Sequence, residues 1–272
     1  MSPAILTLTT DFGGRDYYVG ALKGVALGIL PGVQLVDITH AIPAGDVEAG
    51  AFALGAAAPW FPAGTVHLAV VDPGVGTARR PLAVGARGCL WVGPDNGLLS
   101  HALADPAAEV RQIANPELTR TTLSATFHGR DLFAPAAAHL AAGVALAAAG
   151  PVVADPVRLA APGPRRDRDR LVGVVVHVDA FGNLVTNLAA AALAPLGPRL
   201  QVRLPGAAPV RGLAHTYADV GAGEPVALIG SCDLLEIGVN GGSAARHFGI
   251  DRGAEVVVEP LSPLRPPSPP TP

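Results

Sequence analysis

The sequence predicts an α/β N-terminal domain with a mostly parallel sheet, followed by a small C-terminal antiparallel β-barrel domain. Three observations carry this prediction. Short apolar runs alternate with helix-like segments in the first half, a stretch rich in proline, glycine and alternating charge follows, and short strand-like runs without long helices fill the rest. Strands separated by helices pair in parallel through crossovers, whereas closely spaced strands form antiparallel sheets. At 272 residues, a chain is also near the length at which one core divides into two.

In the first half, strands are expected at residues 4–10, 34–39 and 65–72, and helices at residues 17–30 and 46–61. Two further apolar runs, 81–88 and 89–99, precede a helical stretch at 132–149. Asp11, His40 and Asp72 come at the ends of the first three strands. This is the sheet edge at which open α/β sheets bind ligands.

The composition changes around residues 161–170, where proline, glycine and alternating charges interrupt every hydrophobic pattern. The short β-like pieces beyond it are residues 171–187, 199–205, 209–220, 224–230, 234–240 and 254–260. The predicted organisation is an N-terminal domain at 1–162, a linker at 163–170, a barrel domain at 171–260 and a disordered, proline-rich tail at 261–272.

The composition excludes several classes of protein. Half of the residues are hydrophobic and the formal charge is −3, which fits neither a disordered protein nor a nucleic-acid-binding surface. The longest apolar run, residues 134–150, is interrupted by Pro135, His139 and Gly143, so no membrane span is expected. The N-terminal residues lack a cationic segment, so no signal peptide is expected. Cys89 and Cys232 indicate reduced thiols in a cytoplasmic protein, with a lone disulfide as the alternative.

A glycine-bearing loop with two carboxylates follows the first expected strand, in TTDFGGRDYYVG. Asp11 and Asp16 flank Gly13 and Gly14, and ionised carboxylates accept hydrogen bonds from ribose hydroxyls or an ammonium group. The alternative is structural: Asp16 would cap the following helix and Asp11 would buttress the loop. Spacing alone leaves both interpretations open.

Two further loops carry an aspartate, an arginine and a histidine. Asp72 ends an apolar strand in VVDPGVGTARR, and Arg79 follows it seven residues later. His128 lies beside Gly129 ahead of the last expected helix of this domain. Each residue also fits a purely structural role. Together they would permit general-base chemistry without specifying a reaction.

The second domain offers groups suited to a purine. Asp179, Phe181 and Asn183 surround a glycine turn, where an aromatic face and a carboxamide favour stacking and hydrogen bonding to a base. Ser231 and Asn240 lie in glycine-flanked segments further on. A plain turn is the alternative at both places. The sequence lacks GxGxxG, P-loop, GxSxG, HExxH and CxxC motifs, which disfavours redox-cofactor, kinase, serine-hydrolase and zinc enzymes.

Taken together, these segments resemble the S-adenosylmethionine hydroxide adenosyltransferases, which are hydrolases related to the fluorinase and chlorinase enzymes. Seven segments match in the same order and span roughly residues 6–250. They are residues 8–24, 38–52, 61–84, 92–99, 126–141, 178–187 and 230–249.

The resemblance implies a role for each candidate. The family's water-activating set falls on Asp72, Arg79 and His128, and its ribose-binding carboxylate on Asp11. The other substrate contacts would be Asp16 and Asp179 near the methionine ammonium, Phe181 and Asn183 at the adenine, Ser231 near the amino-acid end, and Asn240 in the same segment. Members form homotrimers in which the ligand lies between one subunit's first domain and a neighbour's second. The implied chemistry uses no cofactor and no metal.

The resemblance also separates hydrolysis from halogenation. In the fluorinase, tyrosines replace the aspartate and the histidine, and a serine that helps to hold halide comes next. Gly129 occupies that serine position here, so the sequence predicts hydrolysis of S-adenosylmethionine to adenosine and methionine. A 5′-halogenase and a non-catalytic nucleoside-binding protein are the alternatives. One departure is Cys232, where the fluorinase has an arginine near the methionyl carboxylate.

Overall fold

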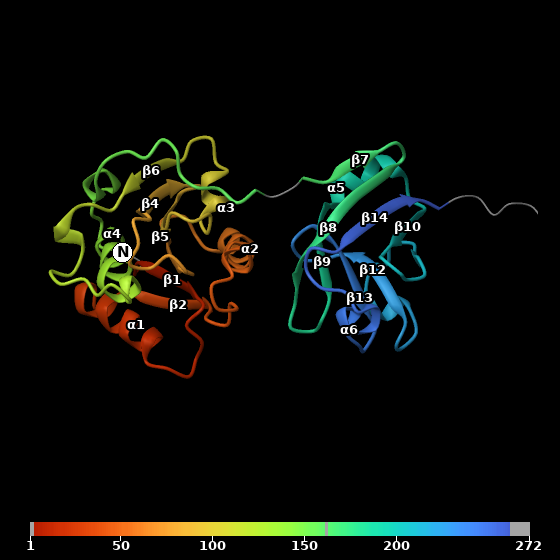
Figure 1. Cartoon of the computed structure of the whole chain (residues 1–272), viewed down its shortest axis with the longest axis horizontal. Coiled ribbons are helices and arrows are strands. Elements are labelled where there is room, and N and C mark those ends of the chain that lie inside the picture. The colour runs from red at the N-terminus through yellow and green to blue at the C-terminus, as the bar shows by residue number, and fades with distance from the viewer. Residues whose placement is uncertain (1–2, 161–162, 262–272) are drawn as a thin grey trace, which may run out of the picture. The chain divides into compact units, whose positions relative to one another are not determined.

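The structure, a computed structural model, describes residues 3–160 and 163–261. The chain divides into two compact units, residues 1–160 and 161–272 (Figure 1). Unit 1 combines a mostly parallel sheet with helices, and unit 2 is an antiparallel, barrel-like sheet. The predicted fold class is confirmed.

Among the described residues of unit 1, six strands form one sheet in the order β2-β1-β3-β5-β4-β6. The strands are β1 Ile5–Thr10, β2 Gln34–Thr39, β3 Val66–Val70, β4 Pro81–Ala86, β5 Cys89–Pro94 and β6 Glu109–Gln112. β1 pairs in parallel with β2 and β3, and β3 with β5, whereas β4 is antiparallel to β5 and β6. A two-residue turn joins β4 to β5, and so short a connection permits only a hairpin.

Helices cover both faces of this sheet. They are α1 Tyr18–Ile29, α2 Val47–Ala57, α3 Ser100–Leu103 and α4 Ala134–Ala141. α1 and α4 pack on one face, and α2 and α3 on the other (Figure 1). Neighbouring strand residues point to opposite faces, so Leu68 of β3 joins the core under α1 and α4 while Ala69 joins the core under α2 and α3. No helix in the described residues is long and apolar enough to cross a membrane.

Unit 2 is built from short strands that nearly close into a barrel. Within residues 163–261 the strand order is β11-β10-β14-β8-β9-β13-β12, and β7 pairs with β8 off this path. The elements are β7 Arg165–Asp167, β8 Arg170–Val178, β9 Leu184–Ala189, α5 Ala190–Leu193, β10 Leu200–Arg203, β11 Val210–Arg211, β12 Pro225–Ile229, β13 Leu234–Val239, α6 Ala244–Phe248 and β14 Glu255–Pro260. The two end strands approach each other, because the backbone N–H of Ala214, just past β11, donates to the carbonyl of Ala227 in β12.

The helix expected over residues 132–149 begins and ends earlier in the structure. It begins earlier, with a π-helical turn at Gly129–Phe133 that continues into α4, and α4 ends at Ala141. Gly143 then adopts a φ of +99°, a backbone conformation that glycine allows and that ends a helix.

The linker expected at 163–170 is partly strand. Residues 165–167 form β7, which pairs with β8 through a hairpin whose last pair is Asp167 and Arg170. The alternating charges at residues 165–170 are exposed on the two strands and the two-residue turn of this hairpin. The segment is therefore structured although it lacks a hydrophobic pattern. Residues 161–162 and all of the predicted 261–272 tail except Leu261 lie outside the described residues.

Candidate active site

Unit 1 carries a cavity of ≈ 480 Å³ at the carboxyl ends of its parallel strands. Asp11 directly follows β1, and Asp72 lies two residues beyond β3, so the parallel pairing of these strands brings both carboxylates to one edge. His128 precedes the π-helical turn that leads into α4. The residues that line the cavity include Asp11, Phe12, Tyr18, Asp72, Phe127 and His128.

Asp72, Arg79 and His128 are in direct contact. Arg79 donates from Nε to Asp72 Oδ1 at 3.0 Å and from Nη2 to Asp72 Oδ2 at 2.5 Å. The same Nη2 lies 2.6 Å from His128 Nδ1. The side chains of Asp72 and Arg79 are only 5% and 9% exposed, so the pair is shielded from bulk water. The sequence spacing allowed Arg79 to fold back onto Asp72, and in the structure Arg79 contacts both Asp72 and His128.

The arginine contact determines how His128 is protonated. Arginine has only donors and stays charged in proteins, so His128 Nδ1 must be the acceptor of that hydrogen bond. The neutral ring therefore carries its proton on Nε2. Burial, and then the charge of Arg79, hold the pKa of His128 below its ordinary value of 6.5. The imidazole is thus neutral at neutral pH and has an N–H left to donate.

Two loops hold this cluster in place. Gly76, between Asp72 and Arg79, has a φ of +78°, and a Cβ on it would collide with the carbonyl oxygen of Ala125. The loop after β3 therefore packs closely on the segment just before His128. Arg79 is further fixed on the ring of Phe133, with 5.0 Å from Cζ to the ring centroid.

Asp11 and Asp16 are placed differently. Asp11 lines the cavity and its Oδ2 accepts from the backbone N–H of Gly45 at 2.8 Å, so it does buttress a loop. Its Oδ1 accepts no hydrogen bond from the described residues and is free for a ligand. Asp16 is exposed and lies outside the residues that line this cavity. It does not cap α1 either, because the N-cap position is Tyr17 and no side-chain hydrogen bond caps the helix.

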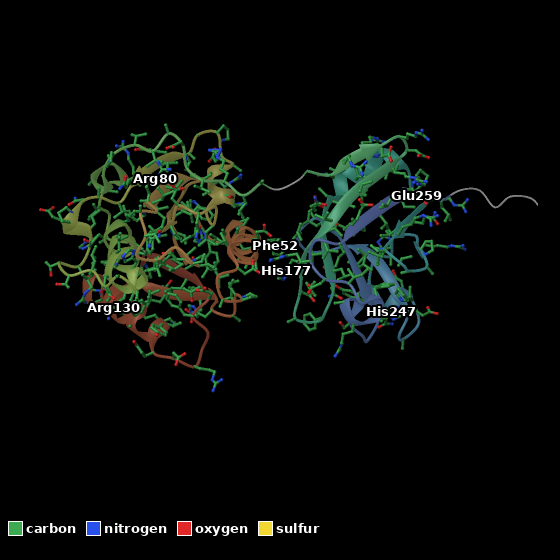
Figure 2. All side chains as sticks on the ribbon, viewed as in Figure 1. Phe52, Arg80, Arg130, His177, His247 and Glu259 are labelled. Atoms are coloured by element: carbon green, nitrogen blue, oxygen red, sulfur yellow. The ribbon has the colours of Figure 1, made fainter. Side chains whose placement is uncertain are left out.

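An aromatic wall beside these polar groups was missed by sequence reasoning. Phe12 lies 5.9 Å from both Tyr18 and Phe127 between ring centroids, and Tyr18 lies 5.1 Å from Phe127. Arg130, labelled in Figure 2, lies over Phe127 with 5.0 Å from Cζ to the centroid. The available signal was that each ring lies within two residues of Asp11, Asp16 or His128 in the sequence.

Unit 2 has its own pocket of ≈ 850 Å³, and four predicted residues line it: Asp179, Phe181, Asn183 and Ser231. Asp179 organises the turn, since its Oδ1 accepts from the backbone N–H groups of Phe181 and Asn183 at 2.9 and 2.8 Å. Its Oδ2 accepts from Asn183 Nδ2 at 2.9 Å. Asn183 is thereby held almost fully buried, while the Phe181 ring is 78% exposed beside it.

Tyr217 and Glu236 also line this pocket, and no sequence motif pointed to them. Asn183 Nδ2 lies 3.4 Å from the Tyr217 hydroxyl, which in turn donates to Glu236 Oε1. Burial, and then the Glu236 carboxylate, raise the pKa of Tyr217, and burial raises the pKa of Glu236. The turn around Asn183 is therefore continued by a chain of polar side chains across the pocket.

Asn240 is not among the residues that line this pocket. Its Nδ2 donates to the carbonyl of Val220 at 2.8 Å, which ties β13 to the segment before β12. Cys232 is exposed in the turn between β12 and β13, and Cys89 is buried in unit 1; both are free thiols. Within the described residues, no group of three or more His, Cys, Asp or Glu side chains gathers in a way that could hold a metal ion.

Both units match models of one protein family. Residues 6–150 match the SAM hydroxide adenosyltransferase N-terminal domain, and residues 173–257 match its C-terminal domain. The chain therefore belongs to the SAM hydroxide adenosyltransferase family. The residues that line the unit 1 cavity and those that line the unit 2 pocket all lie within the matched regions.

Named relatives fall into two groups. The chain is 44% identical to a protein named (R)-S-adenosyl-L-methionine hydrolase of Salinispora tropica, over 91% of this chain and 95% of the relative. A Thermus thermophilus protein of the same name is 43% identical, over 91% and 96%. A fluorinase of Nocardia brasiliensis is 32% identical, over 94% and 96%. A crystal structure of an uncharacterized conserved protein from Thermotoga maritima superposes with a TM-score of 0.87 at 35% identity, covering 93% of this chain and 99% of that one.

Proposed function

We propose that this protein hydrolyses S-adenosyl-L-methionine to adenosine and L-methionine, through attack of an activated water on ribose C5′. The contact of Arg79 with both Asp72 and His128 at the wall of the unit 1 cavity carries this proposal. The relatives named as hydrolases are also more similar to the chain than the named fluorinase.

The reaction explains why no general acid is needed. The C5′–S bond breaks as a C5′–O bond forms, and its electron pair goes to sulfur, which leaves as a neutral thioether. The difficulty lies in the nucleophile, because water is a very weak acid with a pKa near 15.7. We assign no cofactor and no metal to the reaction. The protein must therefore orient the water and receive its proton through side chains.

The hydrogen-bond directions suggest which role each of the three side chains has toward the attacking water. His128 Nδ1 is occupied by Arg79, so the remaining Nε2–H is a donor and would hold the water oxygen. Asp72 is then the group that accepts the water proton. Arg79 would stabilise the hydroxide as its charge develops. Gly129, next to His128, contributes no side-chain hydroxyl for a halide ion.

The ligand contacts in this proposal are divided between the two units. Asp11 would bind the ribose diol and Phe181 with Asn183 the adenine, while Asp16, Asp179 and Ser231 would surround the methionine part. Asn240 would support that end through the Val220 contact rather than touch the ligand. We further propose a cytoplasmic homotrimer in which unit 1 of one subunit and unit 2 of a neighbour share each ligand.

Incubation with S-adenosylmethionine in ¹⁸O-labelled water, with and without chloride, tests the function. Chromatography with mass spectrometry should show adenosine with the label in its 5′-oxygen, together with unlabelled methionine. Because the hydrolase relatives' name specifies the R form, the two sulfonium epimers should be supplied separately. A 5′-chlorinated product would support a halogenase, and binding without turnover would support a nucleoside-binding protein.

A further inference from the structure

Four side chains form a continuous chain behind the loop that carries Asp11. Thr10 Oγ1, at the end of β1, lies 2.8 Å from His40 Nδ1, directly after β2. His40 Nε2 lies 3.1 Å from Asp37 Oδ1, and Lys23 of α1 donates to Asp37 Oδ2 at 2.6 Å. Burial opposes ionisation of Asp37, but Lys23 and His40 hold the pKa of its carboxyl below the ordinary value. The chain thus runs from an ionised pair near the surface to a fully buried hydroxyl.

The direction of these hydrogen bonds follows from the partners. The Thr10 oxygen accepts from the backbone N–H of Phe12 at 3.2 Å, which leaves its own hydrogen for His40 Nδ1. The Asp37 carboxylate lies 3.1 Å from Nε2 as an ion-pair contact that lacks hydrogen-bond geometry, and its charge favours the ring proton on that nitrogen. Thr10 and His40 therefore fix the backbone on the far side of Asp11, at Phe12.

The same histidine also joins two loops through its backbone. The N–H of Gly13 donates to the carbonyl of His40 at 2.7 Å. Further along that loop, the N–H of Gly45 donates to Asp11 Oδ2 at 2.8 Å. Asp11 is thus anchored at one carboxylate oxygen and held by the backbone on both sides, so its second oxygen has little freedom of direction.

We propose that His40 is a positioning residue that aims the free oxygen of Asp11 at the ribose diol, acting through the Thr10 hydroxyl. This rests on the proposed function, which places the diol at Asp11. Strand order placed His40 at the ligand-binding edge of the sheet without giving it a role; the role follows from the contact between Thr10 and His40 across the parallel pair of β1 and β2.

The test compares Thr10→Val with Thr9→Val. Both threonines are fully buried in β1, but Thr9 Oγ1 has no hydrogen-bond partner among the described residues. Calorimetry gives the Kd of each variant for adenosine and for 2′,3′-dideoxyadenosine, which lacks the diol. Thr10→Val should weaken adenosine binding about 2- to 10-fold, the usual effect of one neutral hydrogen bond, and should leave the dideoxynucleoside unchanged. Thr9→Val should leave both unchanged.

Three further variants guard against misfolding. Thr10→Ser keeps the hydroxyl and should restore adenosine binding, and His40→Asn, which keeps a polar atom near the Nδ1 position, should bind adenosine better than His40→Ala. Equal weakening of both nucleosides by Thr10→Val would overturn the inference, because the effect would then be general to the fold. So would a wild-type protein that binds both nucleosides equally. Failure of the proposed function is seen separately, as absence of S-adenosylmethionine hydrolysis by the wild type.

Discussion

Arg79 Nη2 lies 2.6 Å from His128 Nδ1, although 49 residues separate the two in the chain. Through this contact, a residue of the loop after β3 sets the protonation state of a residue that precedes α4. The ring nitrogen that could have acted as a base is occupied. His128 is consequently a hydrogen-bond donor at Nε2, and in the proposed reaction Asp72 is the proton acceptor.

The pH dependence of turnover follows from this arrangement. Protonation of His128 would place a hydrogen on Nδ1, against the Arg79 guanidinium, and break the cluster. Because burial and Arg79 hold the pKa of His128 below 6.5, we expect kcat/KM to fall to half of its plateau at a pH below 6.5. A pH–rate profile of the wild type beside His128→Gln measures this. Half-maximal loss at or above pH 6.5 would contradict it.

Removal of the groups proposed to activate water should affect turnover more than binding. Asp72→Ala, Arg79→Ala and His128→Ala should each lower kcat on the order of 10²-fold, because the groups act on the nucleophile in the transition state. Single-turnover rates measure the loss, and the Kd of adenosine serves as the control for a preserved cavity. Unchanged rates in all three variants would exclude the mechanism.

Asp11 should contribute to binding rather than to turnover. Asp11→Asn keeps an oxygen for the Gly45 N–H but removes the charged acceptor for the ribose diol. Loss of a hydrogen bond to a charged group is worth about 1.5–3 kcal/mol, so KM should rise about 10- to 150-fold while kcat changes little. If calorimetry found the same Kd for adenosine, Asp11 would serve the loop alone.

Shared sites can be tested by mixing two inactive chains. The candidate water and ribose residues lie in unit 1 and the candidate adenine residues in unit 2. In the proposed trimer, subunits of His128→Ala and Asn183→Ala that exchange would rebuild some sites with both residues intact, and activity should return. Mass spectrometry establishes that exchange has occurred. Continued inactivity after proven exchange would place each site within one chain.

Stability should depend on His67, which is fully buried in β3 beside Thr7 and Trp91. Burial lowers its pKa from 6.5 to about 4. The unfolded chain therefore takes up the proton first, and stability should fall as the pH drops from 6.5 toward 4, by up to about 3 kcal/mol. Urea unfolding across this range measures the effect. His67→Phe should lack this component, and parallel curves for both proteins would contradict the prediction.

The order of β1 to β5 with α1, α2 and α4 could be predicted because each element depends on its own periodicity and end signals, whereas the short α3 and β6 were not predicted. The loops after β1, β2 and β3 could be placed at one edge for the same reason, since parallel strands end together. The helix end at Gly143 and the strand β7 were misjudged, because a glycine in a left-handed conformation and an exposed hairpin are decided by backbone geometry rather than by hydrophobic pattern.

The sequence by itself determined the two-part architecture, the family resemblance and the chemical types available at the site. Only the tertiary structure decided that Arg79 bridges Asp72 to His128, that three aromatic rings wall the cavity, that Asn240 serves a turn, and that His40 lies behind Asp11. The physical reason is distance along the chain. A local sequence pattern indicates which face of a helix or strand is buried. Hydrogen-bond partners that are 30 or 49 residues apart are instead determined by strand register and by close packing between loops.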